Sequence, residues 1–180
     1  MYKKILLDIV KNSINSKFDK NITINKDILI KQFSFLNEKK ATFVTLYLDN
    51  NLRGCIGTLY ANRRLIDDLI NNAYMAAFED PRFYELSYEE FLKVSIEISI
   101  LTSPIEILYD NFEDLEQKIK PNIDGVILED KGRRSTFLPQ VWEQLPLFQD
   151  FFAHLCHKGS FEIDKNFKPK VYVYQVEKIK

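Results

Sequence analysis

The chain has 180 residues, of which 46% are hydrophobic and 28% are charged, and its formal net charge at pH 7 is -1. A chain of this length buries its own core, so neither a disulfide nor a metal is needed for folding. The near-neutral charge gives no general attraction to nucleic acid or to an anionic membrane. Two cysteines form no disulfide framework, and no apolar run reaches the ~18 residues of a membrane helix, so we expect a cytoplasmic protein.

The first part of the chain predicts two helices and a β-hairpin. Apolar residues at helical spacing predict an amphipathic helix over 2–18, and a short helix follows Asn25. β-Branched and aromatic residues predict a strand over 41–48. The turn at 49–51 consists of Asp and Asn, which tolerate positive φ, so the segment 53–59 returns antiparallel beside the first strand.

A longer helix and a second polar-faced strand follow. The helix is expected to begin at 61–62 with Asn62 as its N-cap, and to end near Glu79 because of the proline at position 81. Residues 87–90 fit a capping box at the head of a short helical turn. Apolar and polar residues alternate over 94–100, which predicts a strand with one polar face.

The second part of the chain adds helices between further strands. The predicted elements are a charged helix at 111–119, a hairpin of strands at 125–129 and 133–138, a helical turn from Pro139, a helix at 147–158 and a strand at 171–176. In the first of these helices Phe112, Leu115 and Ile119 are expected to face inward. Hairpins separated by helices indicate an α+β fold with a mainly antiparallel sheet flanked by helices. We expect one domain over 1–180, with a smaller subdomain within about 50–105.

Two glycines interrupt the strand that is expected at 53–59. Gly54 and Gly57 flank Cys55, and Arg53 precedes them. Glycine weakens a strand interior, so its presence favours a bulge or the close approach of a backbone or ligand. A cysteine between two such positions is a candidate catalytic nucleophile, because a nearby cation lowers the pKa of a thiol. Arg53 shares the face of Cys55 if both lie on one regular strand.

Each of these residues also has a structural interpretation. Free cysteine is among the most buried residue types, and simple packing is the favoured interpretation of Cys55. Arg53 and Arg82 either bind a carboxylate or phosphate, or form ion pairs with Asp80 or Glu97. For Arg82 the ion pair is favoured, because the segment 80–83 has the composition of a rigid turn. Glu97 is a candidate acid or base, but a salt bridge or a solvated position is favoured.

Two further groups of residues were considered as sites. His154, Cys156 and His157 lie close together in a predicted helix, and Cys55 would complete a tetrahedral zinc set. Their spacing matches no recognised metal motif, so we assign no metal site and no cofactor. The basic hairpin tip at 131–134 is typical of a solvated turn, with phosphate contacts as the alternative.

Four ordered segments resemble a known family. They are 43–46 (FVTL), 52–58 (LRGCIGT), 80–83 (DPRF) and 137–142 (FLPQVW). Over roughly 5–175 the chain resembles the AMMECR domain family, named for the chromosomal region of the human AMME syndrome, whose bacterial members include protein A of the AmmeMemoRadiSam system. The resemblance implies a larger and a smaller subdomain with the Cys55 block near a cleft between them. It also implies two partners, a Memo-like protein related to dioxygenases and a radical SAM enzyme.

Three functions of different classes follow from these observations. The first is a cytosolic enzyme or its substrate-binding subunit, in which Arg53 orients a small anionic ligand and Cys55 reacts. Its cleft would be lined by Arg53, Gly54, Cys55, Gly57 and Arg82. The second is a non-catalytic adaptor that docks on a protein partner and uses the same block as a rigid corner. The third is an RNA-binding module, against which the near-neutral charge argues.

Overall fold

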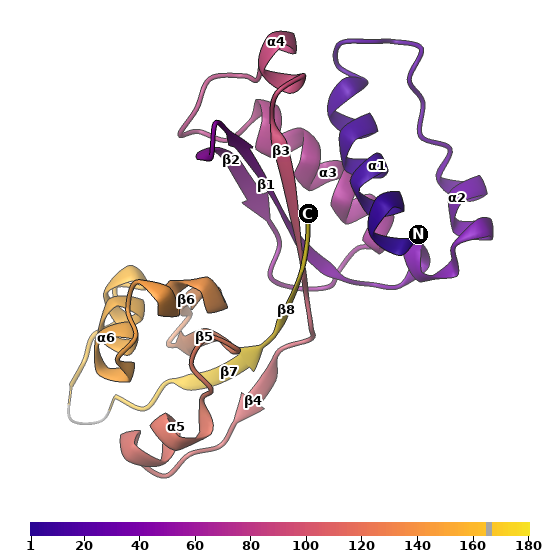
Figure 1. Ribbon diagram of the computed structural model, residues 1–180. Helices are drawn as coiled ribbons and strands as arrows, with labels where there is room; N and C mark the ends of the chain where they lie inside the picture. Colours follow the sequence, from indigo (N-terminus) through magenta and orange to yellow (C-terminus); the bar gives the residue numbers. More distant parts are fainter. Residues whose placement is uncertain (165–166) are drawn as a thin grey trace. The chain divides into compact units, whose positions relative to one another are not determined.

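The computed structural model describes residues 1–164 and 167–180, and the chain forms two compact units (Figure 1). Unit 1 comprises Met1–Leu101 and Glu177–Lys180, and unit 2 comprises Thr102–Val176. Each unit has helices and a four-stranded sheet, which confirms the predicted α+β class. The pairings β1–β2, β1–β3, β4–β7, β5–β6 and β5–β7 are antiparallel.

The sheet of unit 1 has the strand order β2-β1-β3-β8. Its strands are β1 (Ala41–Leu48), β2 (Asn51–Gly57), β3 (Ser95–Leu101) and β8 (Val176–Ile179). The helical segments of this unit are α1 (Tyr2–Asn15), α2 (Lys26–Gln32), η1 (Ser34–Asn37), α3 (Leu65–Phe78) and α4 (Tyr88–Phe91). The smaller subdomain expected at about 50–105 does not match these units, since β2 and β3 flank β1 in one sheet.

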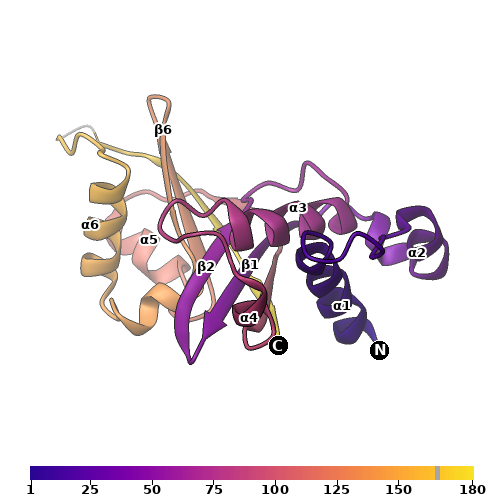
Figure 2. The same ribbon diagram turned by 90° about the horizontal axis from the view of Figure 1, so that it is seen from above.

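One face of this sheet is covered by helices and holds the core of unit 1. Helix α3 packs on β1 and β2, and α1 packs on α3 and β3 (Figures 1 and 2). The apolar residues at helical spacing in both helices are buried against the alternate residues of the strands, as predicted. Fully buried members of this core include Leu6, Val10, Ile14, Val44, Leu46, Ile66, Leu69, Ala73 and Ile98.

Turn and cap chemistry accounts for the local structure that the sequence predicted correctly. Asp49 and Asn50 have φ of 50° and 64° in the tight turn between β1 and β2. The Asn25 side chain accepts a hydrogen bond from the N–H of Ile28 and so caps α2. Ser87 and Glu90 form both bonds of the capping box at the start of α4.

The predicted start of α3 was wrong. The helix begins at Leu65, and the residue before it is Arg64, without a side-chain cap; Asn62 lies in the preceding loop. This loop is held outside the helix by its own contacts. The N–H of Lys40 donates to the carbonyl of Arg63, and Arg64 forms an isolated β-bridge with Lys39.

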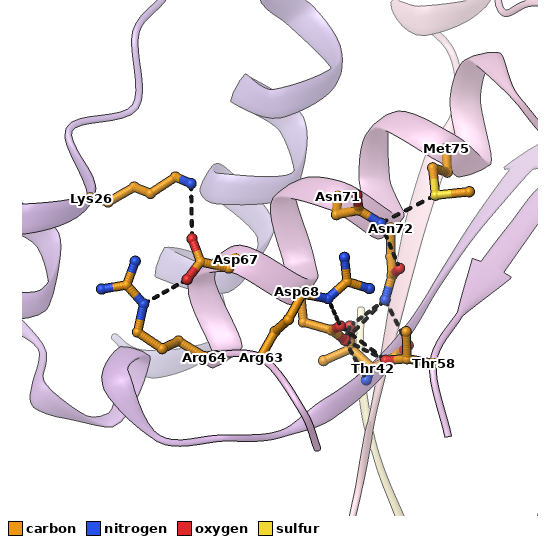
Figure 3. Close-up of polar contacts among 10 residues, drawn as sticks. All are labelled: Lys26, Thr42, Thr58, Arg63, Arg64, Asp67, Asp68, Asn71, Asn72 and Met75. Carbon is orange, nitrogen blue, oxygen red and sulfur yellow. Dashed lines mark hydrogen bonds and ion pairs between the residues drawn. The ribbon is translucent and has the colours of Figure 1, made fainter. Parts of the chain in front are cut away.

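A buried polar network ties α3 to the sheet (Figure 3). The Asp68 side chain is 1% exposed and accepts hydrogen bonds from the N–H and hydroxyl of Thr42, at 2.9 and 2.8 Å. Thr58, Asn72 and Arg63 also contact the Asp68 carboxylate, which is thus fully compensated by donors. The network joins the first residues of β1, the end of β2 and the first turns of α3.

The sheet of unit 2 has the strand order β4-β7-β5-β6, and its helices lie on one face. The strands are β4 (Ile105–Ile107), β5 (Gly125–Asp130), β6 (Arg133–Phe137) and β7 (Lys170–Tyr174). The helical segments are α5 (Phe112–Lys118), η2 (Pro139–Glu143) and α6 (Phe148–Lys158). In both views α5 and α6 lie on the same side of the sheet (Figures 1 and 2).

The structure departs from the sequence prediction at three places in this region. Phe112 is 42% exposed, whereas Leu115 and Ile119 are buried as expected. Strand β4 was not predicted, since three residues carry too short a pattern. The strand expected at 171–176 ends at Tyr174, and a separate strand, β8, joins the sheet of unit 1.

The buried network generates a first prediction. Asp68→Asn replaces one carboxylate oxygen by an NH₂ group, which would face the hydrogen-bond donors that now surround Asp68. We therefore expect the free energy of unfolding to fall by about 2–3 kcal/mol. The matched control is Asp67→Asn in the same helix, a half-buried residue whose partners Lys26 and Arg64 are largely exposed, and the expected loss is below about 1 kcal/mol. Urea denaturation measures both, and equal losses would contradict the assignment.

Candidate functional site

The block at 53–57 forms the C-terminal part of β2, and a β-bulge lies at its start. Leu46 is paired with Gly54, but the next residue, Tyr47, is paired with Leu52, so Arg53 is the extra residue of β2. The regular alternation of side chains between the two faces of the sheet is broken at this point. The prediction that Arg53 and Cys55 share a face required a regular strand, so it does not apply here. The interrupted strand thus has the bulge that its glycines indicated.

Gly54 and Gly57 are required by close packing. A Cβ atom on Gly54 would lie 2.1 Å from the carbonyl oxygen of Ala76 in α3. On Gly57 it would lie 2.2 Å from the ring of Phe43 and 2.5 Å from the carbonyl oxygen of Thr42. Both glycines therefore bring β2 against its neighbours within unit 1, and this geometry gives them a packing role.

Arg53 forms a two-pronged ion pair with Glu90 of α4. Its Nε donates to Oε1 at 2.9 Å and its Nη2 to Oε2 at 2.8 Å. The same Nη2 lies 3.3 Å from the carbonyl oxygen of Glu85. Arg53 is the first cause of the lowered pKa of the Glu90 carboxyl. The partner of Arg53 is therefore Glu90, and neither Asp80 nor Glu97, the two partners considered from the sequence.

Asp80 joins the turn after α3 to the backbone of Cys55. Asp80 is 4% exposed, and its carboxylate accepts a hydrogen bond from the N–H of Cys55 at 2.8 Å. The Arg82 guanidinium donates to both carboxylate oxygens, at 3.0 and 2.7 Å, and also reaches the carbonyl of Cys55 at 3.1 Å. The bonds from Arg82 are the main cause that lowers the pKa of Asp80 to about 2. The ion pair favoured for Arg82 is confirmed.

Phe83 lies close to both arginines. The guanidinium carbons of Arg53 and Arg82 are 5.8 and 5.5 Å from the centre of its ring. These distances are within the range of cation–π attraction. We call Arg53, Gly54, Cys55, Asp80, Arg82, Phe83 and Glu90 the arginine corner. Within it each guanidinium is already bound by a carboxylate.

The Cys55 side chain lies on the sheet face opposite to α3, in a polar row across three strands. Thr45 of β1 is paired with both Cys55 and Glu97, so the three side chains share one face. The sulfur of Cys55 is 3.2 Å from the Thr45 hydroxyl, and the cysteine is half-buried. The pKa of the Arg82 guanidinium is raised chiefly by Asp80 and to a smaller extent by Cys55.

Glu97 is buried and paired with lysine. It is 3% exposed, and Lys180 reaches it at 2.8 Å and Lys178 at 4.0 Å. The favoured salt bridge is thus present. Burial, then the Glu97 carboxylate, raise the pKa of the Tyr47 phenol, with a smaller contribution from Cys55. Glu97, Tyr47 and Lys180 line a hollow of ≈ 750 Å³ over apolar residues of 91–96.

The structure gives no support for the zinc set of Cys55, His154, Cys156 and His157. Cys156 is fully buried in the core of unit 2, where burial raises the pKa of its thiol to about 11. His154 and His157 are exposed on α6, whereas Cys55 belongs to unit 1. Among the described residues, no group of three or more His, Cys, Asp or Glu side chains is arranged to hold a metal ion.

The basic hairpin tip is largely engaged with acidic and carbonyl groups. Arg133 contacts Glu162 and the carbonyl of Ser160, and Arg134 contacts Glu129 at 3.2 Å. Lys131 has φ of 47° in the turn itself. These pairings favour a structural hairpin over a phosphate-binding tip.

Sequence comparison decides which family this fold and site belong to. A sequence model of the AMMECR1 family matches residues 7–179, which include the whole arginine corner. The chain belongs to the AMMECR1 family. The AMMECR1 fold is also seen in the crystal structure of the uncharacterized protein PH0010 from Pyrococcus horikoshii. The comparison of this chain with PH0010 gives a TM-score of 0.78 and 28% sequence identity, and it covers 97% of this chain and 88% of PH0010.

Two archaeal relatives match this chain over most of their own length. Protein MJ0810 of Methanocaldococcus jannaschii is 36% identical over 165 residues, which cover 87% of this chain and 80% of the relative. Protein NEQ441 of Nanoarchaeum equitans is 36% identical over 148 residues, which cover 79% of this chain and 80% of the relative. Within 1–164 and 167–180, no helix has the length and apolar character needed to cross a bilayer.

The lowered pKa of Asp80 generates a second prediction. Its folded-state pKa of about 2 lies below the ordinary value of 3.8, so its interactions stabilise the fold above pH ~4 and this contribution is lost as the pH falls toward 2. Asp80→Asn should lower the free energy of unfolding at pH 7 by about 1–2 kcal/mol. Its difference from the unmodified protein should shrink progressively below pH ~4.

Urea denaturation at pH 7, 4 and 3 measures this difference. Glu79→Gln is the control, because Glu79 precedes Asp80 in the chain but is exposed. A difference that stays constant from pH 7 to pH 3 would contradict the role of the Asp80 carboxylate.

Proposed function

We propose that this protein is a non-catalytic docking protein of the cytoplasm, whose arginine corner fixes the shape of a surface for a protein partner. The observation that carries the proposal is that both guanidinium groups are already paired with a carboxylate of the chain. Arg53 is bound by Glu90, and Arg82 by Asp80, in each case through two hydrogen bonds. A guanidinium that already holds a carboxylate in this way has its best anion-binding geometry occupied.

The corner holds a segment that exposes large apolar side chains. Tyr84, Tyr88 and Leu92 are 94%, 49% and 66% exposed, respectively. The segment that carries them is attached to β2 by the contacts of Arg53 with Glu85 and Glu90. Exposed tyrosine and leucine on a fixed backbone are suited to bind a partner, because little backbone entropy is lost on binding. We call these three residues the docking surface.

The resemblance to the AmmeMemoRadiSam system supplies the proposed partners, a Memo-like protein and a radical SAM enzyme. The proposed compartment is consistent with two free cysteines, Cys55 and Cys156, which suit a reducing environment. The arginine corner and the docking surface belong to the same unit, so one folded body would carry both.

A second candidate function is thiol chemistry at Cys55, on a small anionic ligand. It is favoured by one observation: the half-buried thiol lies beside the Thr45 hydroxyl and interacts electrostatically with Arg82. In the described residues no histidine or carboxylate is hydrogen-bonded to the sulfur, as a general base for a nucleophile would be. The docking function is therefore the better supported.

The docking function predicts the effect of changes on the 84–92 segment. We expect a purified Memo-like or radical SAM protein from the same genome to bind this protein in isothermal titration calorimetry. Tyr84→Ala combined with Leu92→Ala should weaken that binding roughly tenfold or more, since exposed aromatic anchors dominate interface energies. Ile28→Ala is the matched control, because Ile28 is 52% exposed on α2, away from the arginine corner in the chain.

Cys55→Ser should bind the partner like the unmodified protein, because the thiol has no part in docking. Absence of binding to both proteins, or equal binding by the double variant, would contradict the proposal.

The reactivity of Cys55 separates the two candidates. The docking function predicts that iodoacetamide labels Cys55 no faster than a free small thiol between pH 6 and 9. Cys156 should react more slowly still, since it is buried and its pKa is raised to about 11. Mass spectrometry assigns the two sites. Rapid labelling of Cys55 already at pH 6 would contradict the docking function and favour the thiol chemistry.

A further inference from the structure

Unit 2 contains a separate apolar pocket that takes no part in the arginine corner or the docking surface. It has a volume of ≈ 350 Å³, which lies within the size range of small-molecule sites. Residues of α5 and α6 line it, and among the other described residues Ile163 and Phe167 also do so. All of these residues belong to one compact unit.

The walls of the pocket are aromatic. The rings of Phe112 and Phe152 are 5.1 Å apart at an interplanar angle of 74°, and those of Phe148 and Phe152 are 5.6 Å apart. Phe112 and Ile163 are 42% and 66% exposed, so apolar surface remains uncovered at the mouth. The exposed position of Phe112, which the helical pattern placed inward, thus belongs to this pocket.

The charged residues that line the pocket, within the described ranges, are of one sign. Glu113 and Glu116 of α5 are exposed lining residues, and none of the lining residues in the described ranges is lysine, arginine or histidine. Gln149 of α6, which also lines the pocket, donates to both oxygens of Glu116, at 3.3 and 3.2 Å, so this carboxylate is held by a second lining side chain. The buried Cys156 completes the lining as a neutral thiol.

We propose that this pocket binds a small organic cation, an ammonium group carried on an apolar body. The face of an aromatic ring is negative and attracts a cation, and two carboxylates at the mouth add attraction of the same sign. Anionic ligands would be repelled, and neutral ones would gain only apolar contact. The site is independent of the docking function, because it shares no residue with it.

The charge preference is tested with two probes of the same shape. Choline carries a quaternary ammonium, and 3,3-dimethylbutan-1-ol is its uncharged isostere. We expect choline to shift the NMR signals of Phe112, Phe148 and Phe152 in a saturable manner, and the neutral isostere to bind roughly fivefold more weakly or worse. Equal affinity for both probes, or no shift of these signals by choline, would overturn the proposal.

Two variants test where and why the cation binds. Glu113→Gln with Glu116→Gln should weaken choline binding roughly three- to tenfold and leave the neutral isostere unaffected. Ala153→Phe, at an exposed position of α6 that lines the pocket, should fill it and abolish both. Glu106→Gln is the control, because Glu106 is exposed in the same unit but does not line the pocket.

Circular dichroism verifies that each variant is folded. Undiminished choline binding by Ala153→Phe, or by the double glutamine variant, would overturn the proposed site.

Discussion

The buried carboxylate of Asp80 is the constraint on which the geometry of the candidate site depends. It accepts hydrogen bonds from the backbone of Cys55 in β2 and from the backbone and side chain of Arg82. Asp80 is 4% exposed, and a buried carboxylate is costly unless donors surround it, so the turn after α3 must close against β2. Once this turn is fixed, Arg82 and Phe83 take positions that complete the arginine corner.

This closure changes what the arginines can do. From the sequence, anion binding was one of two interpretations of Arg53 and Arg82, because guanidinium groups bind carboxylates and phosphates, and for Arg82 an internal ion pair was favoured. In the structure both receive a carboxylate from the chain itself, at Glu90 and Asp80. The same residues therefore form a rigid connection between β2, the turn after α3 and α4. A rigid connection of this kind is better suited to hold a protein surface in a fixed shape than to bind and release a ligand.

Local signals in the sequence were sufficient for much of the fold and for one part of the site. The hairpin turn at 49–51, the capping box at Ser87 and the ion pair of Arg82 with Asp80 all join residues that are close in the chain. Their chemistry depends on near neighbours, so a single sequence contains the information. The bulge was also indicated, because glycine in a strand interior often marks a bulge or the close approach of another backbone.

Contacts between distant residues could not be predicted in the same way. Arg53 is 37 residues from Glu90, and any of several carboxylates would have been an equally good partner from the sequence. Asp68 and Asn72 occupy helical positions that carry no sign of burial, although they bind Thr42. The change of sheet between β7 and β8 is decided by tertiary pairing, which a run of β-forming residues does not reveal.

The most direct test of the closed arginine corner is an NMR titration of the Arg53 and Arg82 Nε–H signals with inorganic phosphate. If both guanidinium groups are held by Glu90 and Asp80, their signals will be resolved and will not move in a saturable manner as phosphate is added. A saturable shift of either signal at low millimolar phosphate would show an open anion receptor and would contradict the account.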